Sequence, residues 1–180
     1  MENNLPKRKH PRAKDYDYSS DGAYFVTICT HNKKCLLSHI VGRGLAPAEI
    51  EYTQYGKIAE QQLLLLEKRF PSVGVDRYVI MPNHIHVIFV IDNDKTAGAR
   101  GSQKHLCFRD KSPRPTIMDV VCAYKSLTTR ECKRIKALDR LFQTSFYEHV
   151  IRDNRDYEAT VDYICNNPSR WQFDKLNPNI

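Results

Sequence analysis

The sequence predicts one α+β domain in which helices pack against a central antiparallel sheet. Segments rich in aromatic and β-branched residues alternate with segments of helical spacing, in the order β, α, β, β, α, β, α. Two of the strands are separated by only two residues, which favours an antiparallel pair. The chain has 180 residues, the size of one ordinary domain, so we expect residues 1–180 to form a single domain.

In the first half of the chain, turn-forming residues separate segments of clear periodicity. Aromatic and β-branched residues mark the strands, and apolar residues spaced three and four apart mark a helix. A threonine before the helix is a suitable N-cap, and a proline after it ends the pattern. The predicted elements are a strand at 23–30, a loop with short extended pieces at 35–52, a helix between Thr53 and Pro71, and strands at 75–81 and 84–91.

The second half begins with a long polar segment, residues 92–115, which we expect to be a flexible insertion. Thr116 and Asp119 then form a capping-box pattern that opens a helix with its apolar residues, up to Ile135, facing inward. The first two helices should cover one face of the sheet, and the third could close a site elsewhere on it. The remaining elements are a strand at 146–151 and a helix at 154–167, capped by Asp153 or Asn154.

The composition is basic, because 28 Lys and Arg residues outnumber 21 Asp and Glu residues and give a net charge of +7. Such an excess favours a polyanionic partner such as nucleic acid, although a solvated basic surface is the alternative. The cations gather in a basic leader at 1–14 and on the second helix. The candidate DNA-binding residues are Lys7, Arg8, Lys9 and Arg12 in the leader and Lys125, Arg130, Lys133 and Arg134 on the helix.

Several sequence properties bear on the compartment. No apolar run approaches the ~20 residues that a transmembrane helix needs, so we expect no membrane association. The polar, basic N-terminal segment does not resemble a secretory signal, which favours the cytoplasm. The six cysteines are scattered without a C-x-x-C pair, and most lie within apolar patterns. We therefore expect reduced, buried thiols and neither a disulfide framework nor a zinc knuckle.

His84 and His86 are the first candidate metal ligands. They lie two residues apart at the start of a predicted strand, and the two-residue period of a strand places both imidazoles on one face. Two imidazoles on one face can converge on a divalent ion, with further positions left for a third ligand, water or substrate. The alternative is a pair of half-buried strand histidines, each satisfied by one hydrogen bond.

Tyr163 and Asn167 form a second candidate pair. They are four residues apart and therefore share one side of the last helix, where a phenol and an amide oxygen would lie together. Tyr163 lies far from the apolar stripe of that helix, so packing in the core does not explain it. The alternative is a solvent-facing tyrosine and a helix-ending asparagine. The stripe itself consists of Tyr157, Val161, Ile164 and Cys165.

Longer segments between about residues 15 and 172 add a further observation. They are Tyr24-Phe-Val-Thr-Ile-Cys, Tyr78-Val-Ile-Met-Pro-Asn-His-Ile-His, Tyr124-Lys-Ser, Phe146-Tyr-Glu-His-Val-Ile-Arg and Asp162-Tyr-Ile-Cys-Asn-Asn-Pro. In order and spacing they resemble the REP-associated tyrosine transposases, a branch of the single-tyrosine HUH transposases. The insertion at 92–115 departs from the compact members of that family.

The resemblance implies a ferredoxin-like sandwich of the HUH endonuclease type. It implies that His84 and His86 bind a divalent metal ion, Mg²⁺ or Mn²⁺, with Asn167 as third ligand, whereas the ligand chemistry alone would also admit Zn²⁺. Tyr163 would attack single-stranded DNA at a hairpin formed by a palindromic repeat, the REP element. The product would be a 5′-phosphotyrosine intermediate that permits strand transfer in DNA transposition.

The resemblance also implies a monomer, with a homodimer as the alternative. Two other functions compete with strand transfer. One is a domesticated, non-catalytic module that binds structured DNA, and the other is a small metal-dependent hydrolase that cleaves another phosphodiester. Both leave Tyr163 without a role, which favours the transposase reading.

Overall fold

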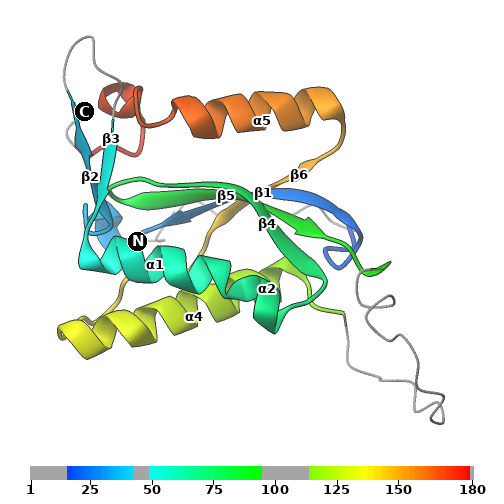
Figure 1. Ribbon diagram of the computed structural model, residues 1–180, viewed down its shortest axis with the longest axis horizontal. Coiled ribbons are helices and arrows are strands. Elements are labelled where there is room, and N and C mark those ends of the chain that lie inside the picture. Colours follow the sequence, from blue (N-terminus) through cyan, green and yellow to red (C-terminus); the bar gives the residue numbers. More distant parts are fainter. Residues whose placement is uncertain (1–15, 43–48, 95–113, 179–180) are drawn as a thin grey trace, which may run out of the picture.

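The computed structural model describes residues 16–42, 49–94 and 114–178, and its centre is a four-stranded antiparallel sheet (Figure 1). The strand order is β4-β5-β1-β6, so β5 and β1 are central and β6 is an edge strand. The long register between β1 and β5 pairs every residue of both strands. The strands are β1 (Gly22–Cys29), β4 (Val73–Ile80), β5 (His84–Ile91) and β6 (Tyr147–Ile151).

Helices cover both faces of this sheet. Helices α1 and α4 lie together on one face, and α5 lies across the other (Figure 1). Without α5, the order of elements and strands is that of a ferredoxin-like sandwich, which confirms the predicted fold class. The helices are α1 (Gln54–Leu64), the short α2 (Leu66–Arg69), α4 (Ile117–Ile135) and α5 (Asn154–Asn166), with single 3₁₀ turns η1 (His31–Lys33) and η2 (Trp171–Phe173).

The helix starts follow from their capping residues. Thr53 accepts a hydrogen bond from the Gly56 amide at the start of α1, and Thr116 and Asp119 form the expected capping box on α4. Asp153, rather than Asn154, caps α5. Each cap satisfies amide groups that have no partner within the helix.

The alternation of side chains along the strands divides the apolar residues into two cores. Tyr24, Val26 and Val87 face α1 and α4 in the larger core. Phe25 and Ile88 face the opposite side, where Ile164 of α5 packs on them. The second core is small, which leaves room beside it for polar groups on the same face of the sheet.

Several predicted details are corrected by the structure. Residues 38–41 and 49–52 form strands β2 (Ser38–Val41) and β3 (Glu49–Tyr52) of a separate two-stranded sheet, where a loop with extended pieces was predicted. The helix after Thr53 breaks at Leu65 into α1 and α2. Ile135 is 49% exposed, because Thr128 and Cys132 occupy the buried positions of the last turns of α4.

The cysteines also differ from expectation. Cys132 is buried, but Cys35, Cys122 and Cys165 are exposed. Cys165 faces solvent because α5 touches the sheet along a narrow stripe through Thr160 and Ile164. The described cysteines are free thiols, as predicted.

Two predicted segments fall largely outside the described ranges. The leader at 1–14, with Lys7, Arg8, Lys9 and Arg12, lies there entirely, as does most of the insertion at 92–115. Within the described ranges, none of the helices has the combination of length and apolar character that a bilayer crossing requires.

Candidate metal and nucleic-acid site

His84 and His86 lie side by side on the face of β5 that α5 covers. Their ring centroids are 4.5 Å apart, and both side chains are buried. The strand alternation that the sequence predicts therefore brings the two imidazoles together. Because β5 is flanked by β4 and β1, the pair sits on a central strand of the sheet.

Hydrogen bonds fix the tautomer of His84. The Asn83 amide nitrogen donates to the carbonyl oxygens of Lys33, at 3.2 Å, and Leu176, at 2.6 Å. The amide oxygen of Asn83 must then face the Nδ1 atom of His84, 2.8 Å away, and it can only accept. His84 therefore carries its proton on Nδ1, which leaves a lone pair on Nε2.

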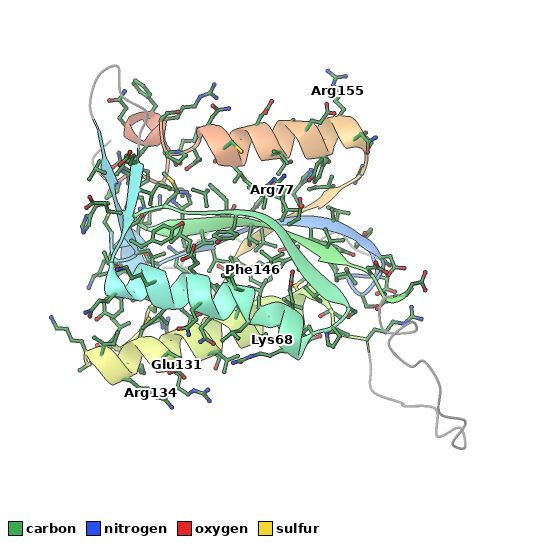
Figure 2. The ribbon with its side chains drawn as sticks, in the orientation of Figure 1. Lys68, Arg77, Glu131, Arg134, Phe146 and Arg155 are labelled. Carbon is green, nitrogen blue, oxygen red and sulfur yellow. The ribbon has the colours of Figure 1, made fainter. Side chains whose placement is uncertain are left out.

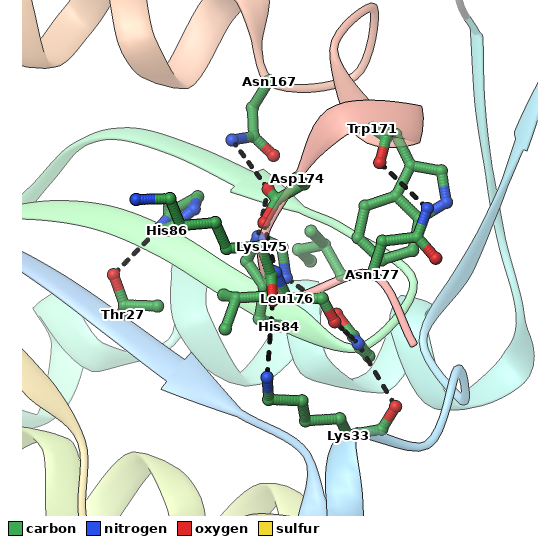
Figure 3. Close-up of polar contacts among 12 residues, drawn as sticks. Thr27, Lys33, His84, His86, Asn167, Trp171, Asp174, Lys175, Leu176 and Asn177 are labelled. Atoms are coloured by element: carbon green, nitrogen blue, oxygen red, sulfur yellow. Dashed lines mark hydrogen bonds and ion pairs between the residues drawn. The ribbon is translucent and has the colours of Figure 1, made fainter. Parts of the chain in front are cut away.

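His86 is held in a similar way by Thr27 on the neighbouring strand. The Thr27 hydroxyl lies 2.9 Å from Nδ1 of His86, and the two residues face each other in the register of β1 and β5 (Figure 3). This contact uses Nδ1 and leaves Nε2 of His86 directed toward the same space as Nε2 of His84. Oriented imidazoles of this kind are typical of metal-binding histidines.

Asn167 and Asp174 approach the histidines from the end of α5 and the segment after it. The Asp174 Oδ2 atom lies 3.8 Å from Nε2 of His84 and accepts a 3.4 Å hydrogen bond from the Asn167 amide nitrogen (Figure 3). One ligand atom each from His84, His86 and Asp174 all lie within 4.8 Å of one another. The Leu176 amide donates to Asp174 Oδ1 at 2.7 Å and holds the carboxylate in place.

Three buried polar atoms at this site find no hydrogen-bond partner among the described residues. They are Nε2 of His84, Nε2 of His86 and Oδ1 of Asn167. A buried polar atom without a partner costs roughly 1–3 kcal/mol, so three in one place require an explanation. Two imidazole nitrogens, an amide oxygen and a nearby carboxylate are a suitable donor set for a divalent cation, and the residues therefore fit one.

The electrostatic environment keeps both imidazoles neutral. Burial lowers the pKa of His84 to about 4, although the Asp174 charge opposes this shift. Burial also lowers the pKa of His86 well below its ordinary value, and His84 adds to the effect. At neutral pH both side chains are in the form that can coordinate a metal.

Tyr163 projects from α5 beside these groups. Its ring centroid is 5.1 Å from that of His86 and 6.0 Å from that of Phe25, and its side chain is 44% exposed. Burial, followed by the charge of Asp174, raises the pKa of the phenol, and Asn167 opposes the shift. Tyr163 thus remains a protonated phenol at neutral pH, half open to solvent.

Tyr163, His86 and Asn167 line one pocket of about 900 Å³. In the described ranges, five large hydrophobic side chains are exposed, and three of them, Tyr147, Tyr163 and Phe173, line this pocket. Unpaired nucleic-acid bases stack on exposed aromatic rings of this kind. Tyr124 of α4, by contrast, is fully buried and donates to the Ala59 carbonyl oxygen, so it belongs to the core.

Sequence reasoning did not find Asn83 and Asp174. Asp174 follows Pro168 and η2, where the chain has no regular period that could predict the direction of a side chain. Asn83 was assigned only to the turn between β4 and β5. Its position directly before His84 was the available signal, because a metal-binding histidine needs a partner for its second nitrogen.

The helical cations lie on α4, in the layer opposite α5. Arg134 pairs with Glu131 at 2.6 Å on the outer side of α4 (Figure 2). Lys125, Arg130 and Lys133 instead line a second pocket. The four cations predicted on this helix are thus divided between two environments.

The chain is similar in sequence and fold to several known proteins. An uncharacterized protein of Haemophilus influenzae is 33% identical over 175 residues, which cover 94% of this chain and 92% of that protein. The REP-associated tyrosine transposase of Escherichia coli K12 is 23% identical, over 91% of this chain and 81% of its own length. No family model matches the chain.

The fold is also found in a solved structure of a REP-associated tyrosine transposase bound to a REP hairpin. That protein is 20% identical, with a TM-score of 0.56, and the match covers 91% of this chain and 77% of the other. Fold and sequence together define a DNA-processing protein of the transposase class. In sequence and in fold the chain is similar to the REP-associated tyrosine transposases.

Proposed function

We propose that this protein cleaves single-stranded DNA beside a hairpin and transfers the cut strand, with Tyr163 as the nucleophile and a divalent metal ion, Mg²⁺ or Mn²⁺, as cofactor. One observation carries the proposal: three buried atoms that have no hydrogen-bond partner among the described residues converge beside a half-exposed tyrosine in a pocket lined by aromatic rings. A solved relative bound to a REP hairpin supports DNA hairpins as the substrate class.

His84, His86 and Asn167 would hold the metal ion, and the position of Asp174 makes it a fourth candidate ligand. When bound, the cation supplies positive charge that polarises the scissile phosphate. Asn83 and Thr27 would keep the two imidazole lone pairs directed at it. A mixed set of nitrogen and oxygen donors suits Mn²⁺ and also admits Zn²⁺, whereas the family implies Mg²⁺ or Mn²⁺.

Tyr163 would attack the phosphorus atom of one phosphodiester linkage. The phenol loses its proton, a bond forms between its oxygen and phosphorus, and the bond from phosphorus to the 3′-oxygen breaks. The 3′-oxygen takes up a proton and leaves as a hydroxyl group, while the 5′-phosphate stays on the tyrosine. One phosphodiester replaces another, so a different 3′-hydroxyl can reverse the step and join two strands without an external energy source.

The surroundings of Tyr163 support this role. Burial raises the pKa of its phenol, so the group is protonated at neutral pH, and its half-exposed position would give a DNA strand access. Tyr147 and Phe173 offer two further aromatic surfaces in the same pocket, on which unpaired bases beside the cleavage point could stack. Duplex DNA, whose bases are already stacked, would gain less from these surfaces.

Adduct formation tests the proposal. Incubation with a labelled hairpin that carries single-stranded flanks, in the presence of Mn²⁺, should give a protein–DNA adduct that survives denaturation. The adduct should disappear in Tyr163→Phe and persist in Tyr147→Phe, a control that removes a hydroxyl from the same pocket. Loss in both variants, or in neither, would contradict Tyr163 as the nucleophile. Salt-sensitive binding without any adduct would favour the non-catalytic DNA-binding module.

We also propose that residues 1–180 act as one catalytic domain in a monomer. The candidate ligands and Tyr163 all come from a single chain, so the site needs no residue from a second copy. Sedimentation of the protein with and without hairpin DNA should give the mass of one chain per DNA. A stable dimer that loses its activity when it dissociates would contradict this assembly.

A further inference from the structure

A second pocket, of about 520 Å³, lies between α4 and the segment that leads into β6. Four of its lining side chains are cations, and hydroxyl groups of serine and threonine lie among them. None of the described residues that line it is acidic. This combination of charges and small donors suits a phosphate group. The cations are Lys125, Arg130, Lys133 and Arg140.

Most of this positive charge is not neutralised by neighbouring carboxylates. In the described part of the chain, Lys133 and Arg140 have no carboxylate within ion-pair distance. Arg130 lies 3.5 Å from Glu131, but its side chain is 62% exposed, and Glu131 makes a closer contact, of 2.6 Å, with Arg134. The pocket therefore keeps an excess of positive charge that is available to an anion.

This basic pocket shares a wall with the Tyr163 pocket. Gln143 lines both pockets, and the residues after it divide between them: Thr144 faces the basic pocket and Ser145 the Tyr163 pocket. Lys125, in the basic pocket, lies 5.9 Å from the ring centroid of Phe146, which lines the Tyr163 pocket. The two pockets are thus on opposite sides of one short segment, residues 142–146.

The wall is fixed to the sheet. The Gln143 amide donates to the Cys29 carbonyl oxygen at 2.9 Å, and the His31 amide donates to the Leu141 carbonyl oxygen at 2.8 Å. Phe142 is buried, with its ring centroid 6.0 Å from that of Tyr124. The basic pocket therefore has a fixed position relative to Tyr163, as a specific phosphate site requires.

We propose that the basic pocket binds a backbone phosphate of the same DNA strand whose bases occupy the Tyr163 pocket. This inference rests on the proposed function, because it takes the Tyr163 pocket as the site of cleavage. The segment 142–146 precedes β6, an edge strand, so a DNA strand can pass around the edge of the sheet from α5 to α4. The pocket would fix the register of the strand without reading its sequence.

Binding measurements in a Tyr163→Phe background test this inference separately from cleavage. The variant Arg130→Gln/Lys133→Gln removes two charges from the pocket, and Lys57→Gln/Lys68→Gln removes two charges from exposed positions of α1 and α2 outside it. Relative to this control, the pocket variant should bind a hairpin with single-stranded flanks about tenfold more weakly. Its slope of log affinity against log salt should be smaller by roughly 0.7, the value for one phosphate of single-stranded DNA. Equal weakening in both variants would overturn the proposal.

A scan of the DNA backbone gives an independent test. Neutral methylphosphonate linkages are placed one at a time in the single-stranded flanks. At one linkage near the cleavage point, the substitution should weaken the affinity of the Tyr163→Phe protein for the DNA. The same linkage should cause no further loss in the pocket variant, because the phosphate and the cations act as one contact. If no linkage behaves in this way, the pocket does not bind the strand. Because no adduct is needed, failure of Tyr163 as the nucleophile would leave this result interpretable.

Discussion

Metal-free protein should lose stability as the pH falls from neutrality, because the two site histidines must stay neutral in the fold. An ordinary histidine has a pKa of about 6.5, and burial lowers that of His84 to about 4. Between these values the unfolded chain binds a proton that the folded protein excludes. Protons therefore favour the unfolded state, and the free energy of unfolding falls as the pH drops through this window.

The size of the effect follows from the same two pKa values. A difference of about 2.5 pKa units corresponds to roughly 3 kcal/mol when the pH has fallen to the pKa of the folded state. At pH 5, about 2 kcal/mol of this should already be lost. The lowered pKa of His86 acts in the same direction. This is a large part of the 5–15 kcal/mol that stabilises a typical domain.

Urea unfolding with a chelator present, at pH 7 and at pH 5, measures the effect. His84→Gln serves as the comparison, because it removes the titrating group and keeps the other histidine side chains in place. Between the two pH values the wild type should lose about 2 kcal/mol more stability than the variant. Equal losses would show that His84 is not held neutral by burial, and the account of its electrostatics would be wrong.

Two further predictions concern single side chains. Asn83→Ala should lower Mn²⁺ affinity about 10–100-fold by calorimetric titration, because His84 would lose the hydrogen bond that fixes its ring and keeps the proton on Nδ1. Unchanged affinity would contradict the assigned orientation of His84. Gly56→Ala should destabilise the protein by about 1–3 kcal/mol in urea unfolding, because a Cβ atom there would collide with the Leu37 carbonyl oxygen. Wild-type stability would contradict the close approach of Gly56 to the Leu37 backbone.

Periodicity was sufficient to predict the main elements of the fold. The strands at 23–30, 75–81 and 84–91 are long and regular, and Thr53, Thr116 and Asp153 are recognisable caps, so these elements match the structure closely. The β2 and β3 strands were missed as strands because each has only four residues, too few for alternation to be distinguished from a loop. Thr128 is buried and Ile135 is not, because α4 leaves the sheet before its last turn. The sequence of the helix alone does not indicate where this happens.

The candidate site was predicted in part. The spacing of His84 and His86 and that of Tyr163 and Asn167 placed each pair on one face, and the structure brings the two pairs together. Their meeting depends on how α5 crosses the sheet, which only the family resemblance indicated. Asp174 could not be found in the same way, because it reaches the site through an irregular segment held by Asn83 and Leu176.

The identity of the residue that becomes attached to DNA tests the central claim most directly. Protease digestion of the adduct, followed by mass spectrometry, should recover a peptide in which Tyr163 carries the 5′-phosphate end of the cleaved strand. A nucleotide on Tyr147 or on any other residue, or cleavage that leaves a free 5′-phosphate and no modified peptide, would contradict the account.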